Sequence, residues 1–482
     1  MHVPSCPPST SAESRGTAQA QGPTQRISRR QGRRMERQRV EDLAAWDGSA
    51  REARRRIGGA STPMPTPVSS ENGVEAELGA FPAPFAAFLK REGVDPGVFD
   101  AVLPRYVRLG PSAGLGGAGG DEGMAVAEEL GTTAAAVTPV RWLPPHYRFY
   151  AVEGEGVGIA HTPAYRAGDL YGIDAASGAA VAALGVAVHE HVLEICCAPG
   201  AKLMLLSDLM KAERQRLERE QLGRSGLSAE EGEVGGAARR EVTVGSVTGV
   251  DVSRNRLGAT RKLLQKYKAQ RARLYLADGR TFDVAPPGAR GAAGEVEWRE
   301  AQARGLPNRA WFWSSRDLPN DLPAAAAALY AGTGKAASGT YDAVLVDAEC
   351  THDGSIKHVS RFSDPEVAQS LARRVLDPER MEALPALQRE LLINGLRLAK
   401  PGGRVVYCTC SFARSQNEDV VAWALEKLGP RVELEAVAEA ANWPCTIGGT
   451  TTDGRRLAHA IRFDPSRSNT SSLFIARLRL KA

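Results

Sequence analysis

A strand, a glycine-containing turn and a helix recur along the chain from about residue 166 onward. The apolar runs "HVLEIC", "VTGVD", "ARLYLAD", "YDAVLVDAEC" and "RVVYCT" have the length and composition of buried strands. Segments with helical spacing lie between most of them, including "KLMLLSDLMKAERQRLERE" and "RNRLGATRKLLQKY". Strands that alternate with helices form parallel sheets covered on both faces, because each crossover is right-handed. The pattern therefore predicts an α/β fold whose ligands bind at the carboxyl ends of the strands.

Composition divides the 482-residue chain into three parts. Residues 1–75 have no sustained apolar period and are rich in Ser, Pro, Gly, Gln and Arg, which indicates a disordered tail. Residues 76–165 mix a short helix with strand-like pieces, so we expect a small α+β domain there. Residues 166–482 contain the repeated unit, and two Gly-, Ala- and Arg-rich segments near 222–245 and 287–340 are predicted surface insertions.

The second insertion carries "RGLPNRAWFWSSRDLP", in which Trp311, Phe312 and Trp313 lie between arginines. Aromatic and Arg side chains can stack on unpaired bases. More often such a cluster packs a long loop onto the body of a protein. We favour packing as the interpretation.

The positive charge of the chain is concentrated in the tail. Residues 1–60 contain 12 Arg against 6 Asp and Glu, whereas the whole chain has a net charge of +5. The body is therefore near neutral and is not a strongly basic nucleic-acid binder by composition. An Arg-rich, acid-poor beginning suits a mitochondrial or chloroplast transit peptide, while "RRQGRRMERQR" suits a nuclear or nucleolar signal equally well. The third interpretation is a solvated tail that carries no targeting signal. In each case we expect an intracellular protein without a membrane span.

Polar residues follow the first three strands of the repeated unit. Pro199 and Gly200 make a tight turn after "HVLEIC", just before a helix that includes Lys202. Backbone N–H groups in such a turn approach a ligand closely, and a helix N-terminus favours a carboxylate. Asp251 ends the second strand, where an acid commonly binds ribose hydroxyls, and Asp278 ends the third. Each acid alone could be a helix cap, but the ordered set predicts an adenosine-containing ligand with a carboxylate-bearing tail.

Two cysteines lie one residue apart where the last of these strands ends, in "VVYCTCSFARSQNE". Cys408 and Cys410 could be buried packing, half of a metal site, or a nucleophile with a neighbour. Seven cysteines without framework spacing indicate a reducing compartment rather than a disulfide scaffold. Because the chain has no C-x₂-C pair and few histidines close to these cysteines, we predict no metal site.

As an ordered series, these motifs resemble the RNA cytosine-5 methyltransferases of the Nol–Nop–Sun type, which are S-adenosylmethionine enzymes with a Rossmann-like fold. "LEICCAPGAK" is similar to that family's D-x-C-A-A-P-G-G-K turn, and "GVDVSRNRLGATRKLLQKY" and "ADGRTF" to its next two motifs. "VDAEC" and "CTCSFARSQNE" are similar to its two catalytic motifs. "YRAGDLYGIDAAS" matches a segment ahead of its cofactor turn, and "SLFIARL" its closing strand. The resemblance covers roughly residues 80–482 and implies that residues 166–482 are the methyltransferase catalytic domain.

The resemblance also implies a role for individual residues. Methylation of carbon 5 needs a thiolate that adds to carbon 6 of the ring, followed by removal of the carbon-5 proton. Cys410 matches the family's nucleophile, Cys350 the cysteine that assists release, and Asp347 the acid that holds the polar edge of cytosine. Positive charge lowers a thiol pKa, and Lys202 and the cofactor's sulfonium are the candidates for it, while Cys408 would pack beneath Cys410. The implied cofactor contacts are Cys197, Ala198, Pro199, Gly200, Ala201, Lys202, Asp251, Arg256, Asp278 and Asp347.

The chain departs from the family pattern at the cofactor turn and around the release cysteine. Ala201 replaces the second glycine of the turn, and Glu349 replaces the proline before the release cysteine. Thr351, His352 and Asp353 replace the small residues that usually follow it. Glu349 and His352 could each accept the carbon-5 proton, or could be loop residues in solvent.

We therefore expect a monomer that transfers a methyl group from S-adenosylmethionine to carbon 5 of cytosine in tRNA or rRNA. The target base must be unpaired or flipped to reach a pocket at the strand ends. A catalytically weak RNA-binding scaffold that retains the fold is the alternative, because the loop after Cys350 is altered. A DNA cytosine-5 methyltransferase is a third interpretation, but such enzymes usually attack from the Pro-Cys loop, which would leave Cys410 without a role.

Overall fold

The computed structural model describes residues 81, 83–111, 113–115, 121–154, 157–225, 244–286, 312–314, 339–356 and 377–481. These residues all belong to one compact unit, Ser70–Ala482. The predicted tail, residues 1–75, lies outside the described residues, as does most of each predicted insertion. Within the described part of the chain, every helix is too short or too polar to cross a membrane.

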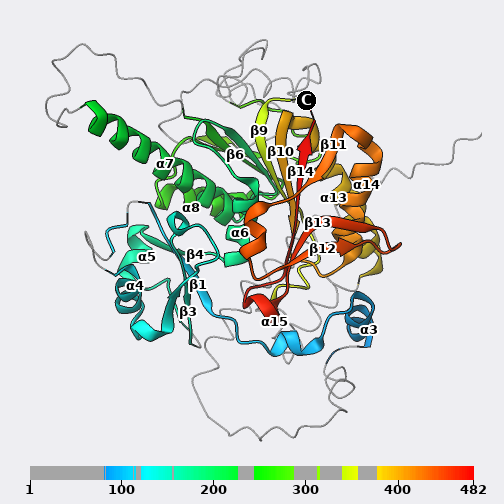
Figure 1. The fold of residues 1–482 in the computed structure, drawn as a ribbon, viewed down its shortest axis with the longest axis horizontal. Helices are drawn as coiled ribbons and strands as arrows, with labels where there is room; N and C mark the ends of the chain where they lie inside the picture. Colours follow the sequence, from blue (N-terminus) through cyan, green and yellow to red (C-terminus); the bar gives the residue numbers. More distant parts are fainter. Residues whose placement is uncertain are drawn as a thin grey trace, which may run out of the picture. The chain divides into compact units, whose positions relative to one another are not determined.

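Five parallel strands form the centre of a large mixed sheet (Figure 1). Their spatial order is β7-β6-β5-β9-β10, so the direction of winding reverses between β5 and β9. In sheets of this kind the reversal opens a crevice at the carboxyl ends of the strands, where ligands bind. The parallel centre confirms the predicted α/β fold. The strands are β5 (His191–Ile195), β6 (Ser246–Asp251), β7 (Ala272–Leu276), β9 (Tyr341–Asp347) and β10 (Ala399–Thr409).

Antiparallel strands extend the sheet at both edges. β14 (Leu473–Leu480), which contains the predicted closing strand, pairs with β10. β8 (Phe312–Ser314) lies in the predicted second insertion and pairs with β7 at the other edge, so this part of the insertion is a strand of the sheet. The sequence analysis did not predict the remaining elements of the β14 flank, which are β11 (Val432–Glu435), β12 (Thr446–Thr450), β13 (Arg456–Phe463) and the short helix α15 (Pro465–Ser468).

Helices cover both faces of the sheet, and successive strand residues alternate between two hydrophobic clusters. Val406 and Cys408 of β10 pack with residues of α6, α7 and α8, whereas Val405 and Tyr407 pack with residues of α13 and α14. This alternation is expected for strands buried on both sides. The helices are α6 (Ala175–Leu184), α7 (Ala201–Ser225), α8 (Arg254–Lys266), α13 (Pro378–Leu398) and α14 (Glu418–Leu428).

A second, smaller sheet precedes the large one in the chain. Its strands are antiparallel, in the order β2-β3-β1-β4, and they pack with α4 (Glu122–Leu130) and α5 (Pro163–Ala167). Because β4 follows residue 165, the small sheet includes residues beyond the predicted domain boundary, and the division into domains stays a prediction. The strands are β1 (Arg105–Leu109), β2 (Val137–Pro139), β3 (Phe149–Val152) and β4 (Leu170–Gly172).

Buried contacts join the early part of the chain to the large sheet. Arg108 of β1 forms an ion pair with Asp208 of α7 and donates to the Tyr171 hydroxyl (2.9 Å). The two charged side chains are 1% and 3% exposed. The aromatic residues of α3 (Ala83–Glu92) instead pack with Ile356 and Phe412, close to the end of β10.

Candidate active site

The turn after β5 is held close to the adjacent helices. Cys197 and Ala198 are each 3% exposed, and the Cys197 N–H donates to the Val250 carbonyl (3.0 Å). Gly200 has φ of 100°, and a Cβ at this position would lie 2.5 Å from Cγ2 of Thr260, so the turn requires glycine. The side chains of Cys197 and Ala198 are thus buried, whereas Pro199 is exposed. The first N–H groups of α7, from Ala201 on, point back toward this turn, an arrangement that suits a carboxylate.

Asp251 ends β6 and Asp278 follows β7, but their surroundings differ. Asp251 accepts hydrogen bonds from the N–H groups of Ala198 (3.2 Å) and Ser253 (2.8 Å), so it ties the β5 turn to the start of α8. Arg256 supports the same turn, because it donates to the Ala198 carbonyl and its Nη1 lies 3.7 Å from Oδ2 of Asp251.

The Asp278 side chain is 35% exposed, against 2% for Asp251. Burial would raise the pKa of Asp278, but the hydrogen bonds from Arg280 outweigh it and lower that pKa. Asp278 therefore stays ionised and is the more accessible acid of the two. Asp251, by contrast, mainly positions the turn.

Asp347, the last residue of β9, contacts two of the other predicted site residues. Its Oδ2 accepts a hydrogen bond from Nζ of Lys202 (2.9 Å), and its Oδ1 lies 3.4 Å from Sγ of Cys408. Burial would lower the pKa of Lys202, but the charge of Asp347 and its hydrogen bond outweigh burial and raise that pKa, so the ammonium stays charged. Lys202 was one of two candidates for the positive charge near the nucleophilic thiol, and in the structure its ammonium pairs with Asp347. Cys408 is fully buried, and burial raises its thiol pKa.

Glu194 lies beneath this group, in the middle of β5. Its side chain is 1% exposed, and burial, together with Asp347, raises its pKa well above the usual range. Within the described part of the chain, its Oε2 has no hydrogen-bond partner. The sequence analysis did not single out Glu194, although an acid inside the apolar run "HVLEIC" was the available signal.

Two cysteines and a histidine meet at the ends of β9 and β10. Cys350 follows β9 and Cys410 follows β10, and because these strands are parallel neighbours, the two Sγ atoms lie 3.4 Å apart. Nδ1 of His352 lies 3.0 Å from Sγ of Cys410 and 3.6 Å from Sγ of Cys350. Cys350 is buried, Cys410 is partly exposed and His352 is exposed, so the group opens to solvent on the side of Cys410 and His352.

The contact between the two sulfurs shifts the pKa of each thiol. The hydrogen bond from Cys410 lowers the pKa of Cys350 despite burial, and His352 lowers it further. The same hydrogen bond and burial raise the pKa of Cys410. Loss of the first proton from the pair is therefore easy, because the thiolate that forms accepts a hydrogen bond from the remaining thiol. Loss of the second proton would place two negative charges in contact.

The loop that carries His352 is fixed on both sides of that residue. The neighbouring Thr351 and Asp353 are buried, and the Phe412 N–H donates to Asp353 (2.7 Å) while the Thr351 N–H donates to Oε1 of Gln416 (3.1 Å). A Cβ at Gly354 would lie 2.5 Å from the Cys410 carbonyl oxygen, so this residue must be glycine for the loop to approach β10. His352 itself has φ of 58°, a left-handed conformation that is uncommon for histidine. The loop therefore holds the imidazole in place beside the sulfurs.

Glu349 is held away from the sulfurs by α13. Its carboxylate forms an ion pair with Arg380 (3.2 Å), and its carbonyl accepts a hydrogen bond from Gln388 (2.7 Å). Of the two residues that the sequence analysis offered as proton acceptors, His352 is the one within hydrogen-bonding distance of Cys410.

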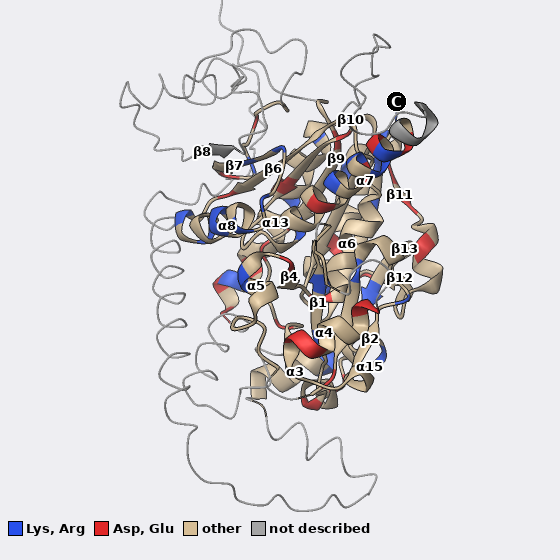
Figure 2. Ribbon diagram, turned by 90° about the vertical axis from the view of Figure 1, so that its left-hand side faces the viewer, with Lys and Arg blue, Asp and Glu red and all other residues tan. Residues whose placement is uncertain are grey.

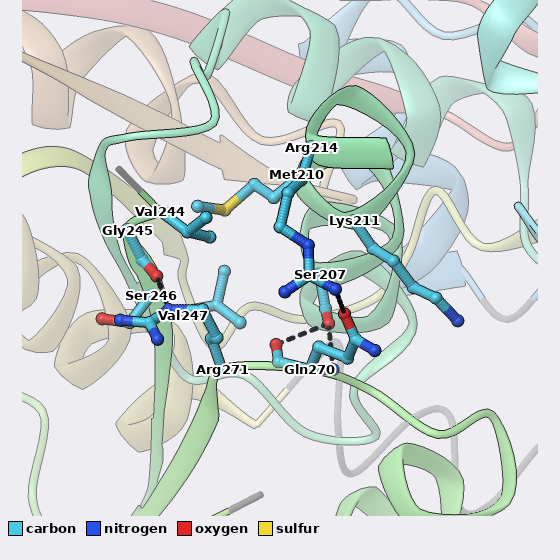
Figure 3. Close-up of a pocket in the computed structure, with 10 residues that line it drawn as sticks. All are labelled: Ser207, Met210, Lys211, Arg214, Val244, Gly245, Ser246, Val247, Gln270 and Arg271. Atoms are coloured by element: carbon cyan, nitrogen blue, oxygen red, sulfur yellow. Dashed lines mark hydrogen bonds between the residues drawn. The ribbon is translucent and has the colours of Figure 1, made fainter. Parts of the chain in front are cut away.

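A small cavity lies elsewhere, between α7 and the beginning of β6 (Figure 3). Nη2 of Arg214 donates to Oε1 of Gln270 (2.6 Å) and Ser207 to the Gln270 carbonyl (3.0 Å), whereas Nε of Arg214 has no hydrogen-bond partner among the described residues. The cavity volume of about 10 Å³ holds roughly one water molecule. Because β6 begins here and ends at the cofactor turn, this cavity lies at the opposite end of the sheet from the cysteines, and it is too small for a nucleoside.

Part of the chain matches a family model of known proteins. Residues 328–479 match the family model described as 16S rRNA methyltransferase RsmB/F, and this span includes Asp347, Cys350 and Cys410. The matched segment, about a third of the chain, is similar to the RsmB/F methyltransferases. The resemblance to Sun-type RNA cytosine-5 methyltransferases, drawn from the motifs, is thereby confirmed.

Relatives with assigned names match parts of the chain. The 5-cytosine rRNA methyltransferase NSUN4 of Mus musculus is 28% identical over 271 residues, which are 56% of this chain and 49% of the mouse protein. Ribosomal RNA small subunit methyltransferase F of Escherichia coli is 30% identical over 139 residues, 29% of this chain and 26% of that protein. This chain thus matches about half of the mouse protein's length and about a quarter of the bacterial one's.

A crystal structure of a methyltransferase homolog from Pyrococcus horikoshii has the same fold. It superposes with a TM-score of 0.51 at 20% identity, and the match covers 86% of this chain and 100% of that one. The similarity confirms the methyltransferase fold of the large sheet and, at this level of identity, concerns the fold alone.

Proposed function

We propose that this chain transfers a methyl group from S-adenosylmethionine to carbon 5 of cytosine in RNA, with ribosomal RNA as the substrate class. The observation that carries the proposal is the pair of sulfurs, Cys350 and Cys410, 3.4 Å apart beside His352 at the ends of adjacent strands. The names of the mouse and bacterial relatives support rRNA over tRNA as the substrate.

The residues at the carboxyl ends of β5 and β7 fit S-adenosylmethionine. The N-terminus of α7 suits its carboxylate, and the accessible Asp278 carboxylate suits the ribose hydroxyls. Oε2 of Glu194, which has no hydrogen-bond partner among the described residues, offers a further polar contact beneath the turn. When bound, S-adenosylmethionine supplies an electrophilic methyl group.

The cysteine pair activates the base in this proposal. His352 takes one proton from the thiol pair, and Cys410 adds as a thiolate to carbon 6 of cytosine, which makes carbon 5 nucleophilic. Asp347, which also contacts the Lys202 ammonium (2.9 Å), accepts a hydrogen bond from the amino edge of the ring. After methyl transfer, Cys410 is a neutral thioether, so Cys350 can lose its own proton to solvent without placing two negative charges in contact. The Cys350 thiolate then accepts the carbon-5 proton, and Cys410 leaves as a thiolate as the ring regains its double bond.

RNA would approach over a basic part of the surface. Helix α8 begins directly after the β6 acid and contains no Asp or Glu, and in Figure 2 its Lys and Arg residues are blue. Of these, Arg254, Arg261 and Lys262 are exposed. Such residues contact phosphates without reading sequence, so they suit an unpaired RNA segment whose target base enters the site.

The direct test measures transfer of a labelled methyl group from S-adenosylmethionine to transcripts of ribosomal RNA, followed by mapping of 5-methylcytosine. We expect methylation by the wild-type chain and no methylation by Cys410→Ala. Binding of RNA without methylation by the wild-type chain would favour the scaffold alternative. Methylation of DNA in place of RNA would favour the third interpretation.

Asp278→Asn is expected to weaken S-adenosylmethionine binding by about 1.5–3 kcal/mol, because the variant loses a charge-assisted hydrogen bond to the ribose. Isothermal titration calorimetry measures the affinity. Asp283→Asn is the matched control, since Asp283 lies in the same segment and forms a comparable ion pair with Arg397 (3.1 Å). Equal affinity in wild type and Asp278→Asn would refute this placement of the ribose.

Removal of residues 1–75 is expected to leave methyl transfer intact and to change where the protein accumulates in the cell, because the removed segment carries the excess Arg. Fluorescence microscopy of full-length and shortened fusions tests the second part, and the methyl-transfer assay the first. If the cellular location of the shortened protein is unchanged and its affinity for RNA falls in a salt-dependent way, the tail is an RNA-binding arm and not a targeting signal.

A further inference from the structure

We propose that Cys350, His352 and Cys410 form a binding site for one thiophilic divalent cation such as Zn²⁺. Within the described part of the chain, their sulfur and nitrogen atoms all lie within 4.8 Å of one another. No metal site was predicted from the sequence, because the chain has no C-x₂-C pair and few histidines close to these cysteines in sequence. The ligands instead come from two adjacent strand ends, β9 and β10, and the loop that follows β9.

The distances match one face of a zinc tetrahedron. Zn–S bonds of about 2.3 Å and Zn–N bonds of about 2.0–2.1 Å at tetrahedral angles place two sulfurs about 3.8 Å apart and a sulfur and a nitrogen about 3.6 Å apart. The corresponding distances here are 3.4 Å between the sulfurs, and 3.0 Å and 3.6 Å from Nδ1 of His352 to Cys410 and Cys350. Each ligand atom needs to move by less than an ångström.

The ligands are held in advance of binding. Thr351 and Asp353 flank His352 and are buried in hydrogen bonds to the segment after β10, and the Gly354 N–H donates to the Cys410 carbonyl (3.0 Å). The loop that carries His352 is therefore hydrogen-bonded to the Cys410 backbone, and the two side chains are also in contact. Two thiolates and a neutral imidazole would balance the charge of a divalent cation. The fourth coordination position would face solvent, since Cys410 and His352 are the accessible members.

Occupation of this site would block the cysteines reversibly. A cation bound to both sulfurs leaves neither free to add to a base, so the loaded protein would be inactive until the metal is removed. This consequence rests on the proposed methyltransferase function, whereas metal binding itself does not.

Titration of the reduced, metal-free full-length protein with Co²⁺ is the test. We expect one equivalent to produce thiolate-to-cobalt charge-transfer absorption and the visible bands of a tetrahedral site, and Zn²⁺ to displace it. Cys350→Ser and His352→Asn should each weaken binding at least about tenfold. Asparagine also tolerates the left-handed conformation of residue 352, so the loop is expected to keep its shape. Cys445→Ser, which removes a partly exposed thiol outside the site, should bind as wild type does.

Absence of the charge-transfer band in the wild-type protein would overturn the proposal, as would unchanged affinity in Cys350→Ser. In a second arm, Zn²⁺ should abolish methyl transfer and EDTA should restore it, while Mg²⁺ has no such effect. The two proposals fail separately. A wild-type protein that binds Co²⁺ but does not methylate RNA refutes the proposed function alone, and one that methylates RNA but gives no cobalt band refutes the metal site alone.

Discussion

Asp208→Ala is expected to lower the free energy of unfolding by about 3–5 kcal/mol, because it leaves the buried Arg108 guanidinium without its counter-charge. Arg108 is 1% exposed, and within the described residues its Nε already has no hydrogen-bond partner. Contacts with the hydroxyl and the ring of Tyr171 would remain. Chemical denaturation followed by circular dichroism measures the change.

Two comparisons separate the buried charge from other effects of the substitution. Glu213→Ala removes an exposed ion pair with Arg216 on the same helix, α7, and should change stability little. The double variant Arg108→Met with Asp208→Leu replaces both charges with apolar groups and should recover most of the loss. If Asp208→Ala were as stable as Glu213→Ala, the pair would not be the contact that fastens β1 to α7.

Much of the fold follows from local patterns that a single sequence carries. The runs that became β5, β6 and β9 are apolar because both faces of the strand are buried, and the helices between them dictate parallel pairing. Gly200 was recognisable because a close approach of the turn to a helix tolerates no Cβ. Asp347 and Cys410 lie at the ends of strands, and because parallel strands end at the same edge of a sheet, both residues could be assigned to that edge from the sequence.

Other features depend on contacts between distant segments. The side chain of Lys202 is long enough to reach several partners, and only the packing of α7 on the sheet shows that Asp347 and Cys408 are those partners. His352 reaches the sulfurs because Asp353 and Gly354 fasten the loop to residues about sixty positions later in the chain. The antiparallel strands β11 to β13 carry short and partly exposed patterns, which single-sequence periodicity does not distinguish from loops.

Cys410→Ala and Cys350→Ala are expected to fail at different steps of the proposed reaction. Without the Cys410 sulfur nothing adds to carbon 6, so this variant should neither methylate RNA nor form a covalent link to it. Without Cys350, addition and methyl transfer can proceed but proton removal stalls, so this variant should accumulate a protein–RNA adduct. Denaturing gels of protein incubated with labelled RNA and S-adenosylmethionine detect the adduct directly.

The neighbours of the pair test the assignment of these roles. His352→Asn should slow methylation by about 10²-fold or more without trapping an adduct, because the imidazole acts before addition. Cys408→Ala should lower stability by about 1 kcal/mol, since it shortens a buried side chain. Cys445→Ala, outside the site, controls for removal of a thiol.

Two outcomes would reassign the proton transfers. If His352→Asn traps the adduct and Cys350→Ala turns over slowly, the imidazole and not the Cys350 sulfur removes the carbon-5 proton. If the adduct forms with Cys410→Ala and is absent with Cys350→Ala, the nucleophile is Cys350. In that case the lower thiol pKa, and not exposure to solvent, would decide which sulfur adds to the base. The contact with Cys410 and the nearby His352 lower the pKa of the buried Cys350, whereas Cys410 is the partly exposed sulfur.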